Sequence, residues 1–176
     1  MIADKMKNMV ANSSAIRAMF EEGTRLAGIY GAENVFDFSL GNPNVPAPQI
    51  VKDAIVELVN DTDPVVLHGY TNSNSGYPEV REAIAKSLNE RFDTKFSGKN
   101  IVMTVGAAGG LNVILKSLIN PGDEVIAFAP YFGEYRSYTN NYDGVLVEIS
   151  PNTVDFQPKL DEFEQKITPK TKAVIV

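Results

Sequence analysis

The sequence contains no cysteine and a single histidine, His68. Without cysteine there are no disulfide bonds, no thiolate catalysis and no cysteine-ligated zinc site. One histidine disfavours a histidine-based metal site and a Ser-His-Asp triad, so we expect no metal centre and interpret His68 as a loop or interface residue. The lack of thiols is also consistent with a reducing cytoplasm.

The chain also lacks a basic cluster and a long apolar run. Its 16 Lys and Arg are outnumbered by 22 Asp and Glu, which gives a formal net charge of −6. This balance disfavours a nucleic-acid partner or an anionic membrane surface. No segment has the apolar length of a membrane span, and the mixed-charge start, residues 1–7, is unlike a signal peptide. We therefore expect a cytoplasmic protein.

The most informative pattern that is present lies at residues 101–118. The apolar run 101–105 predicts a strand, and the small residues 106–110 predict a tight turn into a helix. Leu111, Ile114, Leu115 and Leu118 recur with helical spacing. A strand, turn and helix in this order leave backbone N–H groups free at the start of the helix, where they favour an anion such as phosphate.

Strands and helices are predicted to alternate from residue 101 onward. The later apolar runs at 125–129, 145–149 and 173–176 alternate with helical patterns near 133–141 and 160–167. Short strands that are apolar on both faces are typical of a mostly parallel sheet covered by helices. We therefore predict a three-layer α/β/α sandwich.

The first part of the chain predicts fewer regular elements. Residues 13–30 indicate a helix with Ser13 or Ser14 as its cap, and residues 35–40 alternate like a short strand. Residues 41–48 contain three prolines and must be irregular. An apolar helical stripe runs from Ile50 to Val59, a polar loop covers about 60–77, and Pro78 suits the first turn of a helix.

The last predicted strand, 173–176, reads as buried on both faces, yet the given sequence stops inside it. Since a sheet needs a neighbour and a covering helix at such a strand, we expect these residues to be the first part of a longer protein.

Four segments resemble, in order, the amino-terminal half of the class I and II aminotransferases, which are fold-type-I enzymes that use pyridoxal phosphate. The segments are residues 38–48, 69–84, 101–111 and 120–132, the last followed by Tyr135. Each alone is a weak signal, but their order and spacing over residues 35–176 make the resemblance specific. It implies that residues 1–45 are an arm or small-domain segment, and that residues 46–176 are the first part of the cofactor-binding large domain.

The resemblance also implies roles for five residues. Ala107 and Ala108 match the positions whose N–H groups hold the cofactor phosphate, and Phe132 matches the aromatic that stacks on the pyridine ring. Gly41 matches the glycine beside the substrate carboxylate. Tyr70 matches the tyrosine that reaches the phosphate in the neighbouring subunit, which implies a homodimer with shared sites. Many relatives carry a polar residue at the position of Ala108 and a tryptophan at that of Phe132.

The implied activity is transfer of an amino group from an amino acid to a 2-oxo acid. The lysine that forms the Schiff base in this family is expected beyond Val176, and no lysine of the chain has its context. We therefore expect residues 1–176 alone to be inactive and to contain no catalytic residue.

Other interpretations stay open at this point. A carbon–sulfur lyase or an amino-acid decarboxylase on the same scaffold would share all four segments, and a non-catalytic regulatory module could keep the fold. Residues 106–110 could serve only helix–sheet packing. A plain dinucleotide-binding domain is disfavoured, because the turn lacks the G-x-G-x-x-G spacing and Ala129 and Pro130 stand where an acidic residue is expected. Tyr131, Tyr135 and Tyr138 are expected to face the core, with the mouth of the site as the alternative.

Overall fold

The computed structural model describes residues 2–11, 15–38, 41 and 43–176. The chain divides into two compact units, residues 1–77 and 78–176. The predicted helix cap at Ser13 or Ser14, and residues 39, 40 and 42 of the first resembling segment, lie outside the described residues. The division expected at residue 45 stays a prediction.

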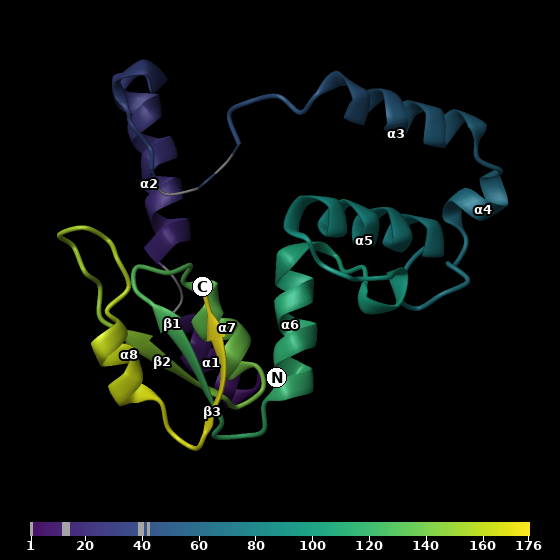
Figure 1. The fold of residues 1–176 in the computed structure, drawn as a ribbon. Helices are drawn as coiled ribbons and strands as arrows, with labels where there is room; N and C mark the ends of the chain where they lie inside the picture. The colour runs from purple at the N-terminus through teal and green to yellow at the C-terminus, as the bar shows by residue number, and fades with distance from the viewer. Residues whose placement is uncertain (1, 12–14, 39–40, 42) are drawn as a thin grey trace. The chain divides into compact units, whose positions relative to one another are not determined.

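The regular elements among the described residues of the first unit are all helices (Figure 1). Its elements are α1 (Asp4–Ala11), α2 (Ala15–Tyr30), the short 3₁₀ helix Ala32–Asn34, α3 (Gln49–Asp61) and α4 (Pro64–His68). The predicted helices at 13–30 and 50–59 are confirmed by α2 and α3, and the described residues of 41–48 form no helix or strand, as predicted.

Two predictions for this unit are wrong. Residues 35–38 form no strand, since no other strand of the described residues pairs with them. The polar loop at 60–77 contains α4. Asp63 begins this helix, because its Oδ1 accepts hydrogen bonds from the amides of Val65 at 2.8 Å and Val66 at 3.2 Å, and Pro64 occupies the first turn.

The second unit contains the sheet. Its elements are α5 (Pro78–Phe92), the 3₁₀ helix Gly98–Asn100, α6 (Gly106–Leu118), β1 (Glu124–Phe128), α7 (Glu134–Asn140), β2 (Val145–Ile149), α8 (Leu160–Lys166) and β3 (Thr171–Ile175). The strands lie in the order β2-β1-β3, and both pairs are parallel. Helix α5 begins at Pro78 as predicted.

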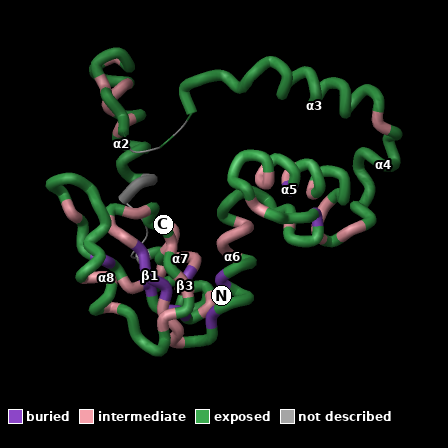
Figure 2. Tube along the Cα trace, in the orientation of Figure 1, coloured by how far each residue is buried: buried purple, intermediate pink, exposed green. Residues whose placement is uncertain are grey.

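The central strand β1 has a core on each face. Val125 and Ala127 belong to a cluster with Leu115 of α6, against which Tyr135 and Tyr138 of α7 pack. Phe128 points to the opposite face, where its ring centroid lies 5.5 Å from that of Phe163 in α8. Figure 2 shows buried residues concentrated in β1. Helices therefore cover both faces of the sheet, which confirms the predicted α/β/α arrangement.

Two sheet predictions need correction. The predicted strand at residues 101–105 does not form, because a strand needs a hydrogen-bonded neighbour and the described residues provide none. In β3 only one face is half-buried, and Val174 and Val176 are exposed rather than buried. Within the described part of the chain β3 is an edge strand, which pairs with β1 alone. Among the same residues, no helix has both the length and the apolarity to cross a membrane.

Candidate functional site

The first turn of α6 presents free backbone donors. Gly106 has a φ of +69°, a conformation that favours glycine, and its amide donates to the carbonyl of Thr104 at 3.0 Å. Ala107 and Ala108 follow, and both are exposed. Among the described residues no side chain caps this helix, and its first turn contains no acidic residue. The amides of Ala107 and Ala108 are therefore available to an anion.

Small side chains keep this turn compact. A Cβ at Gly110 would lie 3.2 Å from the hydroxyl oxygen of Thr104, which is tighter than an ordinary contact. That hydroxyl also donates to the carbonyl of Gly106 at 3.1 Å. Gly110 is therefore in a tight contact, whereas a Cβ at Gly106 would meet open space and the start of the helix is left open. The helix–sheet packing and anion-binding interpretations of residues 106–110 both stay predictions.

Phe132 lies in the turn between β1 and α7. The amide of Tyr135 donates to the carbonyl of Phe132 at 3.0 Å, which starts the helix. The ring of Phe132 meets that of Tyr135 edge to face, with centroids 5.8 Å apart and an interplanar angle of 82°. Phe132 is 53% exposed, so part of its ring is open to solvent.

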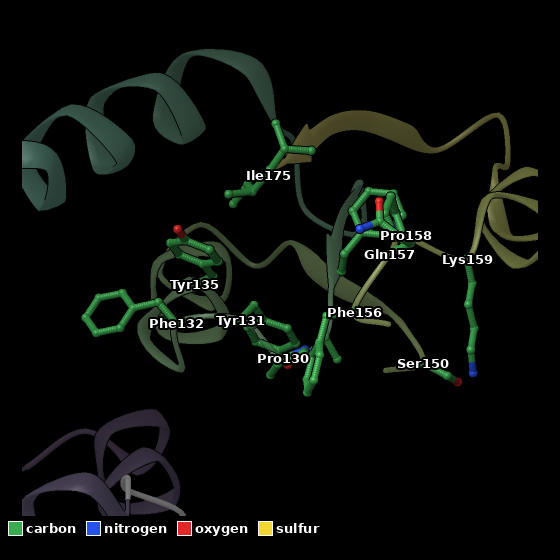
Figure 3. A pocket seen from close by; sticks show the side chains of 13 residues that line it. Pro130, Tyr131, Phe132, Tyr135, Ser150, Phe156, Gln157, Pro158, Lys159 and Ile175 are labelled. Atoms are coloured by element: carbon green, nitrogen blue, oxygen red, sulfur yellow. The ribbon is translucent and has the colours of Figure 1, made fainter. Parts of the chain in front are cut away.

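A cavity of about 510 Å³ opens beside this turn. It lies at the carboxyl ends of β1 and β3, the usual place for a ligand in an open α/β sheet. Tyr131, Phe132, Tyr135, Phe156 and Lys159 are among the residues that line it (Figure 3). Phe132 stands at its rim, with its ring directed away from Phe156.

Tyr131 is held in place by two charged side chains. Its hydroxyl donates to Glu148 of β2 at 2.9 Å and accepts from Arg136 of α7 at 2.7 Å. Burial raises the pKa of Tyr131, and the hydrogen bond to the Glu148 carboxylate adds to this. The rings of Tyr131 and Tyr135 stack with centroids 6.2 Å apart. Tyr131 and Tyr135 thus line the cavity and also pack on the core, whereas Tyr138 packs on the core and is not among the cavity-lining residues.

The Arg136–Glu148 link is a feature that sequence reasoning missed. Arg136 Nη2 and Glu148 Oε2 are 3.5 Å apart and belong to different elements, so no local sequence spacing predicts the pair. The only available signal was the polar Glu148 in an otherwise apolar strand.

Gly41 and Tyr70 belong to the first compact unit. Gly41 is exposed and lies in irregular chain, where a Cβ would meet open space. Tyr70 is fully exposed in the loop after α4. These observations do not test whether Gly41 or Tyr70 contacts a ligand, so their implied roles stay predictions. The described residues contain no group of three or more His, Asp or Glu side chains that could hold a metal ion.

Comparison with known proteins identifies the relatives of this chain. The family model "Aminotransferase class I and II" matches residues 33–176. An aminotransferase from Eubacterium rectale of known structure is 45% identical, with a TM-score of 0.91, and the match covers 100% of this chain and 44% of that one. An aspartate aminotransferase from Thermotoga maritima is 32% identical over 145 residues, which is 82% of this chain and 37% of the relative.

A crystal structure of an aspartate aminotransferase from Thermotoga maritima, 29% identical, matches with a TM-score of 0.80 over 98% of this chain and 44% of the other. The likeness to solved structures along the whole chain confirms the predicted fold class. The chain spans less than half the length of these relatives.

Proposed function

Because this chain belongs to the class I and II aminotransferases, we propose that it supplies the cofactor-binding part of an enzyme that moves an amino group from an amino acid to a 2-oxo acid. The cofactor of the family is pyridoxal phosphate. The lysine that holds this cofactor in the family is expected outside residues 1–176, and the cytoplasm is the expected compartment.

The observation that carries the proposal is the open start of α6. The uncapped amides of Ala107 and Ala108 suit a phosphate dianion, because backbone donors need no side-chain ordering and the helix dipole adds attraction. The first turn of α6 contains no acidic residue, so no carboxylate on this turn would repel the phosphate. These features fit the phosphate of the cofactor.

Besides donors for its phosphate, pyridoxal phosphate needs an aromatic surface on which its pyridine ring can stack, and Phe132 offers one. Its exposed face could hold a flat pyridine ring, with a gain of about 0.5–1.5 kcal/mol beyond that from buried area. When bound, pyridoxal phosphate acts as an electron sink for the substrate α-carbon. The residues of this chain would then bind and orient it, with Gly41 beside the substrate carboxylate and Tyr70 reaching the phosphate of a second subunit in a homodimer.

The test is a coupled assay on the whole protein with pyridoxal phosphate, 2-oxoglutarate and a panel of amino donors. Aspartate belongs in the panel because several relatives are named aspartate aminotransferases. We expect glutamate to form only when donor, acceptor and cofactor are all present. Release of pyruvate and ammonia without acceptor would identify a lyase, release of carbon dioxide a decarboxylase, and binding without turnover a regulatory module.

A second test concerns residues 1–176 by themselves. We expect no turnover and no lysine trapped by borohydride reduction in the presence of pyridoxal phosphate, because no lysine of this chain has the family context. Peptide mapping that found a reduced cofactor on one lysine within these residues would contradict the assignment.

A further inference from the structure

The side chain of Asn112 joins two helices of the second unit. Its Nδ2 donates to the carbonyl of Ala108, one turn earlier in α6, at 2.8 Å. Its Oδ1 accepts from the side-chain amide of Asn141 at 3.1 Å and from the hydroxyl of Tyr142 at 3.4 Å. Because a carbonyl can only accept, Ala108 fixes which end of the Asn112 amide faces it, and the oxygen is left for the other two groups.

Packing holds both sides of this link. Leu115, one turn after Asn112, is buried in the core cluster that α7 also contacts. Lys116 of α6 lies 5.4 Å from the ring centroid of Tyr142 and holds that ring beside the helix. Asn141 is the C-cap residue directly after α7, and its amide donates to the carbonyl of Ser137 at 2.9 Å. Asn112 therefore connects the first turn of α6 to the end of α7.

These two helices carry the two halves of the proposed cofactor site. The first turn of α6 contains Ala107 and Ala108, and α7 begins directly after the turn that contains Phe132. Helix α7 has 7 residues, about two turns, so we expect a shift at its end to reach its start. A displacement of well under an ångström between phosphate donors and ring surface is enough to weaken both contacts at once.

We propose that Asn112 is a positioning residue that sets the phosphate-binding turn of α6 relative to Phe132. This inference rests on the proposed function. It also distinguishes Asn112 from Ser117, which makes the same kind of bond on the same helix: the Ser117 hydroxyl donates to the carbonyl of Val113 at 2.8 Å. Within the described part of the chain the Ser117 side chain makes no hydrogen bond to another element, so Ser117→Ala is the matched control for Asn112→Ala.

The experiment measures dissociation constants of the whole apo-protein for pyridoxal phosphate and for pyridoxal, which lacks the phosphate. In Asn112→Ala the preference for the phosphorylated form should fall roughly three- to tenfold, the size expected when a charge-assisted hydrogen bond is weakened. Ser117→Ala should keep the wild-type preference. Asn141→Ala, at an exposed position, removes one of the two hydrogen bonds that the Asn112 Oδ1 accepts and leaves that from Tyr142, so it should lower the preference in the same direction but by less.

The result also separates a positioning role from a packing role. If Asn112→Ala and Asn141→Ala lower the thermal midpoint but keep the wild-type preference for the phosphate, the positioning role is overturned while the phosphate site stands. If wild type and Ser117→Ala show no preference for pyridoxal phosphate over pyridoxal, the proposed function fails and this inference fails with it.

Discussion

The carboxylate of Glu162 accepts two hydrogen bonds from Ser150, one from its amide at 3.0 Å and one from its hydroxyl at 2.9 Å. Glu162 lies in the first turn of α8, and Ser150 directly follows β2. Lys166 adds an ion pair to the same oxygen at 2.7 Å. One half-buried carboxylate therefore links the helix to the carboxyl end of the sheet.

The first prediction concerns acid stability. The hydrogen bond from Lys166, followed by that from the Ser150 amide, lowers the pKa of Glu162 from 4.5 to about 2. A carboxyl with a lowered folded-state pKa stabilises the fold above pH 4.5, and this contribution is lost as the pH falls through about 2. Glu162→Gln should therefore have a lower free energy of unfolding than wild type at neutral pH. Between pH 4.5 and about 2 its free energy of unfolding should fall less steeply than that of wild type, as measured by urea unfolding at a series of pH values. Glu164→Gln, an exposed position on the same helix, is the control and should follow wild type.

The second prediction tests the amide of Ala107. Proline is tolerated in the first turn of a helix but has no N–H, and the preceding Gly106 has no Cβ to hinder the ring. Ala107→Pro should weaken pyridoxal phosphate binding about 10- to 100-fold, the value of a hydrogen bond to a charged group, with pyridoxal affected far less. Ala107→Ser keeps the amide and should bind as wild type does. Equal binding by the proline variant would show that this donor does not meet the phosphate.

The third prediction concerns the ring of Phe132. Phe132→Leu keeps an apolar side chain but removes the aromatic face, and we expect the dissociation constant for pyridoxal phosphate to rise about two- to tenfold. Phe132→Trp should restore tight binding because it offers a larger face. The measurement is a titration followed by cofactor absorbance. Leucine and tryptophan variants with the same affinity would place the cofactor elsewhere.

The fourth prediction tests Tyr70 across subunits. Tyr70 is fully exposed, so Tyr70→Phe should leave thermal stability of the chain unchanged. If its hydroxyl reaches a phosphate in a second subunit, the same variant should weaken cofactor binding about tenfold or more, and only where the protein is dimeric. Cofactor titration over a range of protein concentrations, with sedimentation to follow assembly, checks this. A defect of equal size in the monomer would argue against a shared site.

Much of the fold was predictable because hydrophobic periodicity reports burial. Val125 to Ala127 are apolar, buried and central, and here the apolar run correctly predicts a strand. Residues 101–105 carry the same signal and form no strand, since pairing depends on a neighbour that local sequence does not describe. Helix α4 was missed because a single Asp-Pro pair inside a polar stretch starts it.

The candidate site likewise has a part that the sequence predicts and a part that it does not. Ala107, Ala108 and Phe132 were found from segments whose order resembles a family, and the structure places them on an open helix start and at the rim of a cavity. The contacts of Tyr131 with Glu148 and of Asn112 with Asn141 join residues that are distant in the chain. The one local sign of the second contact was an asparagine inside a helix, a residue that the helix interior disfavours.

The open amides of α6 have a consequence for how this protein can vary. A donor that belongs to the peptide is supplied by nineteen of the twenty amino acids, and it does not ionise at any ordinary pH. Saturation mutagenesis at positions 107 and 108 should therefore tolerate most small replacements and reject proline. If these amides bind the cofactor phosphate as proposed, lineages that vary at these two positions would keep the same donors without selecting a particular side chain.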